Sequence, residues 1–222
     1  MPYRQTDNVV RRLAGRHDAI LAAAGDAVVE GGMAAVQVAP VAARAGVAAG
    51  TVYRYFPSKI DLVVALVAML SARELAALER AATAAPGPLS ALAAAIATFA
   101  ARALARRRLA FALIAEPVEP AVDAARASYR QALAATFEAL IRKALAARHL
   151  PDQDAALAAL AILGALVEAL VGPLAPAVAG DPANLRARVQ MLTLLALRAL
   201  GVVDARARGL VVQAAVPEPD ES

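Results

Sequence analysis

The residues whose side chains suit molecular recognition gather in one short stretch of the chain. Within Val36–Leu62, hydroxyl, guanidinium and ammonium groups follow one another closely: Thr51, Tyr53, Arg54, Tyr55 and Lys59. Tyrosine hydroxyls and lysine ammonium groups donate hydrogen bonds to phosphate oxygens, and arginine reaches either a phosphate or the O6 and N7 edge of guanine. This grouping indicates contact with a nucleic acid.

Two short helices are predicted to position these side chains. Pro40 suits the first position of a helix over residues 40–45, because the N–H that proline lacks would be unpaired there. Gly46 permits a turn with positive φ, and a second helix is expected over residues 49–55. With a supporting helix over residues 16–30, this pattern is typical of a helix-turn-helix, whose second helix enters the major groove of DNA.

The second short helix has an inner and an outer face. Val52 and Phe56, four residues apart, are expected to pack inward, whereas the small residues Ala49 and Gly50 allow close approach to DNA. Half-buried packing is the alternative role for the two tyrosines, and a solvated surface charge is the alternative for Arg44. The residues predicted to contact DNA are Gln37, Arg44, Ala49, Gly50, Thr51, Tyr53, Arg54, Tyr55 and Lys59.

The composition narrows the classes of function. The chain has 222 residues, a net charge of +4, and 60% hydrophobic but only 4% aromatic residues, with alanine the most frequent type. Alanine is the strongest helix former, so an almost entirely helical protein is expected. The absence of cysteine excludes disulfides and cysteine-based metal or thiol chemistry, and the two histidines lie far apart. Without paired carboxylates or a glycine-rich phosphate loop, no enzymatic activity, cofactor or metal is expected.

The long apolar stretches do not have the pattern of membrane spans. Residues 81–101 are interrupted by Pro86-Gly87-Pro88, and residues 155–180 contain Glu168 and Pro173. A span needs about 20 apolar residues, and the first residues of the chain lack the apolar core of a signal peptide. The chain is therefore expected to act in the cytoplasm, without a membrane partner. The alternative interpretation is a helical scaffold or membrane-surface protein without sequence-specific DNA binding.

The positions of proline and glycine predict about nine helices and no strand. Ser58 and Asp61 form a Ser-x-x-Asp start signal for the helix that follows the two short ones. Beyond the three helices already named, helices are expected over residues 58–82, 89–107, a short piece to 115, 121–148, 152–171 and 184–200.

The expected domain organisation has four parts. Residues 1–15 form a basic N-terminal arm, 16–60 the helix-turn-helix domain, 61–202 a larger helical domain and 203–222 a flexible tail. The arm carries several arginines, which either reach DNA or belong to a mobile charged tail: Arg4, Arg11 and Arg12.

Residues 41–59, which read VAARAGVAAGTVYRYFPSK, resemble the tetracycline-repressor (TetR) family of bacterial transcriptional repressors. The family pattern is roughly Ile-Ala-x-x-Ala-Gly-Val-Ser-x-Gly-Thr-Leu-Tyr-x-His/Tyr-Phe-x-x-Lys, and Ala-Gly-Val, Gly-Thr, Tyr-x-Tyr-Phe and Lys59 fall in register. Two departures concern the strength of DNA contacts. Ala48 stands where the family usually has a capping serine, and Gln37 stands where it often has threonine. Loss of such a cap costs about 1 kcal/mol.

The resemblance implies an all-α homodimer with an N-terminal DNA-binding domain and a C-terminal domain that binds a small molecule. It implies a repressor that leaves a near-palindromic operator in double-stranded DNA when its effector, expected to be apolar, binds. Residues of the C-terminal half that could line the effector pocket are Phe99, Phe111, Glu116, Tyr129 and Phe137. Glu168 is a second acidic candidate, and core packing is the alternative for the aromatic residues.

The last two long helices are rich in alanine, leucine and glycine, and small residues let helices approach closely. Paired across a two-fold axis, these helices would form a four-helix interface, with a monomer core as the alternative. The residues assigned to the interface are Leu157, Leu160, Ala161, Gly164, Ala165, Glu168, Leu192, Leu195 and Ala199.

Overall fold

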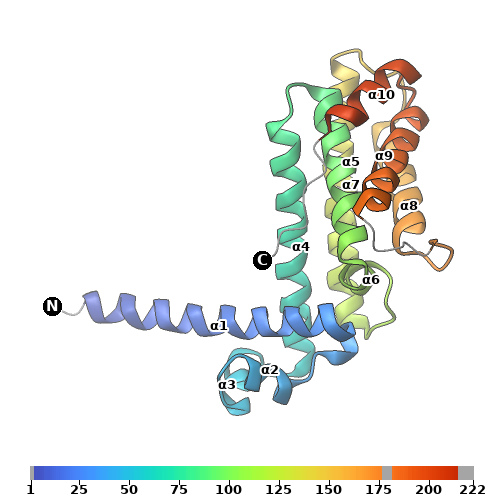
Figure 1. The fold of residues 1–222 in the computed structure, drawn as a ribbon. Helices are drawn as coiled ribbons and strands as arrows, with labels where there is room; N and C mark the ends of the chain where they lie inside the picture. The colour runs from blue at the N-terminus through green and yellow to red at the C-terminus, as the bar shows by residue number, and fades with distance from the viewer. Residues whose placement is uncertain (1–2, 177–181, 215–222) are drawn as a thin grey trace.

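The computed structural model describes residues 3–176 and 182–214, and all regular elements within these ranges are helical (Figure 1). The elements are α1 (Tyr3–Gly31), the 3₁₀ helix η1 (Met33–Ala35), α2 (Val38–Arg44), α3 (Ala49–Tyr55), α4 (Lys59–Ala84), α5 (Pro88–Ala105), α6 (Arg107–Ile114), α7 (Pro120–Ala146), α8 (Ala155–Val171), α9 (Pro182–Ala199) and α10 (Asp204–Gln213). The predicted all-α class is confirmed, and each of the nine expected helices has a counterpart.

The helix α4 joins the two parts of the molecule. Its first turns lie with α1, α2 and α3 at one end, and its remaining length runs into a bundle with α5 and α7 (Figure 1). The central helix of this bundle is α5, which packs against α4, α7 and α9. The helix α5 is long and apolar enough to cross a membrane. However, 72% of its 18 residues are buried inside the fold, as in the core helix of a bundle.

Local sequence signals fix the start of α4. The Ser58 hydroxyl accepts a hydrogen bond from the Asp61 backbone N–H at 3.1 Å and donates one to the Asp61 carboxylate at 2.8 Å. These bonds satisfy one of the free N–H groups of the first turn and place a negative charge at the positive end of the helix dipole. The predicted start signal is confirmed.

The first helix is longer than predicted, because α1 begins at Tyr3 rather than at Arg16. The segment predicted as a basic arm is therefore helical from residue 3 onward and continuous with the supporting helix. No proline interrupts this segment, so nothing in its sequence breaks the helix. A Cβ added at Gly15 would meet no atom within 4 Å, so the packing does not require glycine there. The side chains of Arg4, Arg11 and Arg12 lie outside the described part of the chain.

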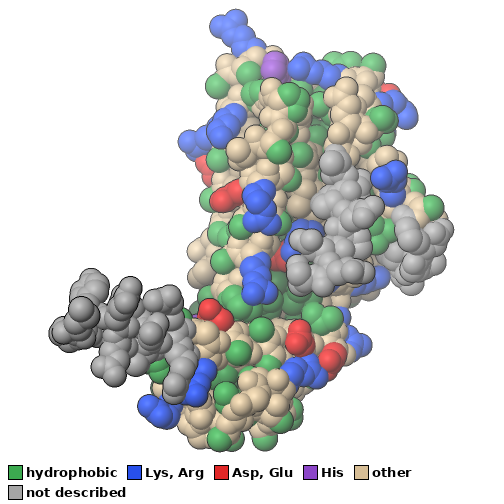
Figure 2. All heavy atoms as spheres, turned by 60° about the vertical axis from the view of Figure 1, so that its left-hand side comes forward, with side chains coloured by type: hydrophobic (Ala, Val, Ile, Leu, Met, Phe, Trp, Pro, Cys, Tyr) green, Lys and Arg blue, Asp and Glu red, His purple; other side chains and the backbone are tan. Residues whose placement is uncertain are grey.

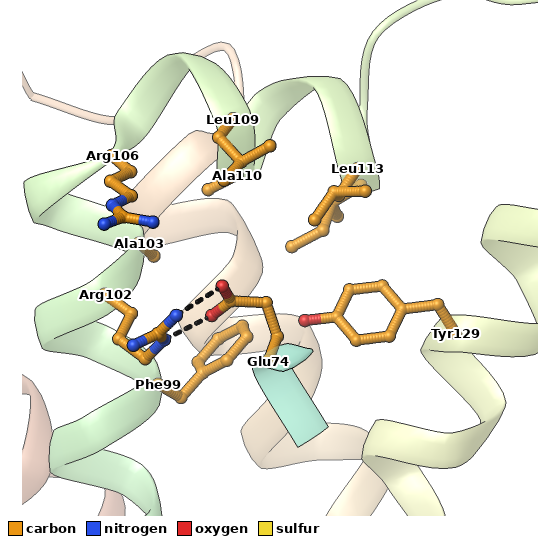
Figure 3. A pocket seen from close by; sticks show the side chains of 10 residues that line it. Glu74, Phe99, Arg102, Ala103, Arg106, Leu109, Ala110, Leu113 and Tyr129 are labelled. Atoms are coloured by element: carbon orange, nitrogen blue, oxygen red, sulfur yellow. Dashed lines mark hydrogen bonds and ion pairs between the residues drawn. The ribbon is translucent and has the colours of Figure 1, made fainter. Parts of the chain in front are cut away.

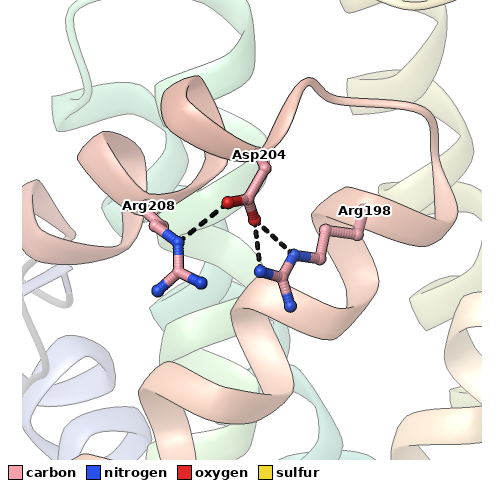
Figure 4. Close-up of polar contacts among 3 residues, drawn as sticks. All are labelled: Arg198, Asp204 and Arg208. Carbon is pink, nitrogen blue, oxygen red and sulfur yellow. Dashed lines mark hydrogen bonds and ion pairs between the residues drawn. The ribbon is translucent and has the colours of Figure 1, made fainter.

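The predicted flexible tail also begins too early, because residues 204–213 form α10, which packs against α9 and α5. Ala207 and Val211, four residues apart, are buried in this contact. The Asp204 carboxylate accepts hydrogen bonds from Arg198 of α9 and from Arg208 of α10 (Figure 4). Those hydrogen bonds lower the pKa of Asp204. The remainder of the predicted tail, residues 215–222, lies outside the described residues.

Candidate functional site

The inner face of α3 is fixed by buried apolar contacts. Val52 and Phe56 are both almost completely buried, as is Val41 of α2, which confirms the predicted packing face. The His17 ring of α1 lies against Phe56, with ring centroids 5.2 Å apart. The orientation of α3 is therefore set by α1 and α2 together, and its opposite face is turned outward.

The turn between α2 and α3 has the geometry that its glycine suggests. Gly46 has φ of +67°, and the following residue closes the turn by donating from Val47 N to Ala42 O at 2.9 Å. Ala48 is the N-cap of α3 and makes no side-chain cap bond, so the expected loss of the cap is confirmed. The first turn of α3 consequently presents its backbone N–H groups with little side-chain cover.

The outer face of α3 combines small residues with long polar ones. Ala49 and Gly50 are exposed, and a Cβ added at Gly50 would meet no atom within 4 Å. The fold therefore does not itself require glycine there, and the missing side chain lowers the surface at the start of α3. Tyr53 is 51% exposed and Arg54 is exposed beside it.

A polar hollow lies between this face and α1. Its lining residues are Leu13, Arg16, Thr51, Arg54 and Tyr55. Two guanidinium groups at its edge make it a place where a phosphate could lie. Figure 2 shows basic side chains at the lower end of the molecule, where the helix-turn-helix lies. Hydrophobic side chains are visible at the lowest part of the same end.

Three predicted contact residues are turned toward the protein instead. The Tyr55 hydroxyl is buried, with no hydrogen-bond partner among the described residues, and its ring lies near His17. Arg44 forms an ion pair with Glu30 of α1 at 2.8 Å, which raises the pKa of Arg44 and lowers that of Glu30 through their shared hydrogen bond. The Gln37 amide donates to the Ala34 carbonyl at 3.0 Å. In this conformation the Tyr55 hydroxyl does not reach the surface, and its phosphate contact stays a prediction.

Lys59 stands exposed at the first position of α4, as predicted. Free backbone N–H groups of a first turn and an ammonium group together favour an anion. Lys59 also borders a second hollow, shared with η1 and with the loop between α6 and α7, where Met33 and Glu116 lie.

A small cavity lies inside the C-terminal bundle (Figure 3). Its lining residues are Glu74, Phe99, Arg102, Ala103, Arg106, Leu109, Ala110, Leu113, Ile114 and Tyr129. Glu74 of α4 accepts two hydrogen bonds from Arg102 of α5, from Nε at 2.6 Å and from Nη2 at 2.8 Å. The volume free to a small molecule is about 20 Å³, enough for one water-sized group.

The short helix α6 forms one wall of this cavity and is held at its C-terminal end by α7. The buried Arg126 donates to the carbonyls of Leu113 and Glu116, and Arg130 donates to that of Ile114 at 3.1 Å. These bonds satisfy carbonyls that a helix end leaves unpaired. Burial lowers the pKa of Arg126.

The same helix contacts the N-terminal part of the molecule at two points. Arg108 of α6 donates to the Glu30 carbonyl at the end of α1. Glu116, which follows α6, accepts a hydrogen bond from the Met33 backbone N–H at 3.0 Å. Gly32 has φ of +73°, and a Cβ there would come within 3.1 Å of the Glu116 carboxylate. The α6 region therefore connects the cavity wall to the end of α1.

Residues 20–66 match the family model described as bacterial regulatory proteins, tetR family. The matched segment includes α2, α3 and the start of α4. This segment of the chain is therefore similar to the DNA-binding part of TetR-family regulators.

Curated relatives match over short segments of the chain. The HTH-type transcriptional repressor KstR of Rhodococcus jostii (strain RHA1) is 59% identical over 39 residues, which cover 18% of each chain. KstR of Mycobacterium tuberculosis is 46% identical over 63 residues, covering 28% of this chain and 29% of the relative. The matched segments thus span less than a third of these relatives.

Solved structures resemble this chain over nearly its whole length. SmeT in complex with triclosan gives a TM-score of 0.68 at 22% identity, covering 93% of this chain and 99% of that one. SmeT is the repressor of the Stenotrophomonas maltophilia multidrug efflux pump SmeDEF. RolR in complex with resorcinol gives a TM-score of 0.66 at 20% identity, covering 94% and 98%. These likenesses show the fold of both domains.

The structure separates the residues predicted for the effector pocket. Phe99 and Tyr129 line the cavity, and Phe137 lies behind them, buried, with its ring centroid 6.2 Å from that of Phe99. Phe111 is 39% exposed on the outward side of α6 and does not line the cavity, although the preceding residue, Ala110, does. Glu116 is at the junction with η1, where it borders the second hollow rather than this cavity. Glu168 is exposed on α8 and does not line this cavity either.

The ion pair of the cavity was not predicted from the sequence. Arg102 is the only charged residue of α5, a helix otherwise built from small and apolar residues. A single charge in an apolar helix is a usable signal, because a charge in a core requires a partner. The partner, Glu74, could not be named without the packing of α4 on α5.

The residues predicted for the dimer interface form an exposed apolar surface on α8 and α9. Leu157, Leu160 and Leu195 are 66%, 58% and 59% exposed, and Met191 lies exposed on the same helix as Leu195. Their small neighbours Ala161, Gly164, Ala165 and Ala199 are exposed as well, whereas Leu192 is half-buried. An apolar surface of this kind marks an interaction site.

Proposed function

We propose that the chain is a homodimeric transcriptional repressor that a small-molecule effector releases from its operator. The outward face of α3 carries this proposal: Ala49, Gly50, Tyr53 and Arg54 face solvent while Val52 and Phe56 anchor the helix beneath. In a helix-turn-helix such a face lies in the major groove, with Arg54 and Thr51 nearest the base edges and Lys59 on a phosphate.

The exposed leucines of α8 and α9 support dimer formation. A two-fold pair brings the same surface of both subunits together, and water leaves the apolar side chains of each. Two copies of α3 then meet two half-sites of a near-palindromic operator. The KstR relatives are described as repressors, which supports repression as the outcome of binding. The site of action is the bacterial cytoplasm, where chromosomal DNA lies.

The size of the cavity supports control by an effector. About 20 Å³ does not hold a drug-sized molecule, so a ligand must displace a wall. The shortest helix in the wall of the cavity is α6. Its Arg108 binds the end of α1, and Glu116, which follows it, binds the start of η1. A ligand that binds better when α6 has moved must lower operator affinity by the same coupling free energy. Resorcinol in RolR and triclosan in SmeT support a small-molecule effector.

The test is selection of bound fragments from random duplex DNA with the full-length protein. We expect an inverted repeat whose half-sites are separated by about one or more helical turns. Arg54→Ala is expected to change the selected bases. Arg73→Ala, an exposed arginine on α4 away from α3, is the matched control and should select the same repeat as the wild type. Failure to enrich any sequence would contradict DNA recognition and favour a scaffold role.

A further inference from the structure

The cavity contains a small polar group of side chains in an otherwise apolar wall. Glu74 and Arg102 have side chains only 15% and 20% exposed, and two hydrogen bonds join them. Figure 3 shows the Tyr129 hydroxyl pointing toward the Glu74 side chain, whose two carboxylate oxygens are turned toward Arg102, and among the residues drawn the hydrogen bonds join only Arg102 and Glu74. Tyr129 is 4% exposed, so its hydroxyl meets either the cavity or protein, and not bulk water.

The charges of this group disfavour an ionic ligand. A ligand carboxylate that bound Arg102 would separate it from Glu74 and leave Glu74 buried without its partner. A ligand ammonium group that bound Glu74 would likewise separate Glu74 from Arg102. Breaking a buried ion pair by removing one partner is strongly destabilising. Arg106 also lines the cavity, but it has an interaction of its own and therefore does not offer a spare positive charge. A ligand without net charge leaves the pair intact.

The free hydrogen-bonding positions specify one donor and one acceptor. Burial, and then the charge of Glu74, raise the pKa of Tyr129, so its hydroxyl keeps its proton and can donate. The Glu74 carboxylate accepts from Arg102 and has further lone pairs available. A group between them must accept from Tyr129 and donate to Glu74, which an alcohol or phenol oxygen does and an ether oxygen does not. The free volume holds one oxygen-sized group.

Apolar residues surround this polar point. Phe99, Leu109 and Leu113 line the remaining wall, two of them from α6. One turn earlier on the same two helices, the hydroxyls of Ser71 and Thr98 are buried without a partner among the described residues. The apolar wall favours an aromatic or aliphatic body attached to the single polar oxygen.

We propose that this cavity binds a neutral molecule with a hydroxyl group on an apolar, ring-sized body. This inference rests on the proposed function, since it names the chemical class of the effector. The hydroxyl lies between Tyr129 and Glu74, and the body lies against Phe99 and the inner side of α6. Entry of the body pushes α6 away from α4 and α5.

The test uses four probes that share one ring and differ in one group: para-cresol, para-methylanisole, para-toluate and para-methylbenzylammonium. Each is titrated into the full-length protein, with thermal unfolding and ligand-detected NMR as the readouts. We expect para-cresol to bind about tenfold more tightly than each of the other three, because it alone gains both hydrogen bonds without breaking the ion pair. Equal or tighter binding of the acid or the amine, or no binding of para-cresol, overturns the inference.

Two variants separate this role from a structural one. Tyr129→Phe is expected to weaken para-cresol about tenfold and to leave para-methylanisole unchanged. Glu74→Gln is expected to let para-toluate bind, because the buried carboxylate that repels the acid is then gone, whereas Glu79→Gln, exposed on the same helix, should keep the order of the probes. An unchanged probe order in Glu74→Gln contradicts the inference. If Tyr129→Phe does not fold, the order of the probes on the wild type decides.

The proposed function fails separately, because the DNA selection contains no probe. Enrichment of an operator together with tighter binding of para-toluate overturns only the ligand class. Tighter binding of para-cresol without any enriched DNA supports the cavity chemistry and contradicts the repressor.

Discussion

The two functional regions of this molecule place their polar side chains in opposite ways. In the helix-turn-helix, Tyr53, Arg54 and Lys59 come from one short stretch and face solvent above a buried apolar face. In the cavity, Glu74, Arg102 and Tyr129 come from three helices and are largely buried. The first region can change its specificity by surface substitution at little cost to folding, whereas the second uses charges that the fold must keep paired.

Substitutions in the proposed dimer surface should have the largest effect, because the proposed operator binding needs two copies of α3. Leu160→Asp combined with Leu195→Asp places charges in the proposed interface without removing any buried group. We expect monomers, and operator affinity lower by about 100-fold or more, since two linked half-site contacts are replaced by one. Sedimentation and mobility-shift titration measure both quantities.

Val203→Asp is the matched control, because Val203 is also exposed but lies before α10. It should remain dimeric. If the double variant dimerises like the wild type, the subunits pair through a surface other than α8 and α9.

Lys59→Ala tests the surface region alone. Loss of one phosphate contact should weaken matched and scrambled DNA alike, by about tenfold at low salt, and should reduce the salt slope by about one unit. Tyr53→Phe should likewise weaken both, with a smaller change in slope. A loss confined to the matched sequence would instead place Lys59 near a base edge. Thermal stability is expected to stay at the wild-type value, because the side chain is exposed.

The same difference explains what could be predicted from sequence. Val52, Phe56, Gly46 and Ser58 could be assigned because each acts through neighbours a few residues away. Tyr55 could not, since its hydroxyl is buried only when α3 packs near His17 of α1.

Pairing across long sequence distances was the second limit. The Glu74–Arg102 pair and the Glu116–Met33 bond join residues 28 and 83 positions apart, and helical periodicity carries no information on such partners. The existence of α10 was missed for a related reason. Helix termini depend on tertiary contacts, here the burial of Ala207 and Val211, as much as on local propensity.

The junction between the regions should give a smaller effect. Glu116→Ala removes the acceptor of the Met33 N–H, so we expect that amide to exchange about tenfold faster with solvent. Operator affinity should change only a few-fold, while the response to a cavity ligand weakens. Glu119→Ala, exposed in the same loop, is the control. Unchanged exchange at Met33 would mean that Glu116 does not hold η1.

The smallest effect belongs to α10, which touches neither region's polar groups. Asp204 has a pKa lowered by hydrogen bonds from Arg208 and Arg198, so its contribution to stability is full above the unfolded pKa of about 3.9 and is lost as pH falls through the lower folded value. Asp204→Asn should therefore lower the unfolding temperature slightly at neutral pH, and the difference from wild type should shrink below about pH 4. Salt should reduce it too, because the three side chains are exposed. Operator binding should not change, with Asp152→Asn as the exposed control. A pH-independent difference would show that the charge of the Asp204 carboxylate does not stabilise the contact between α9 and α10, in contradiction to the ion pairs with Arg198 and Arg208.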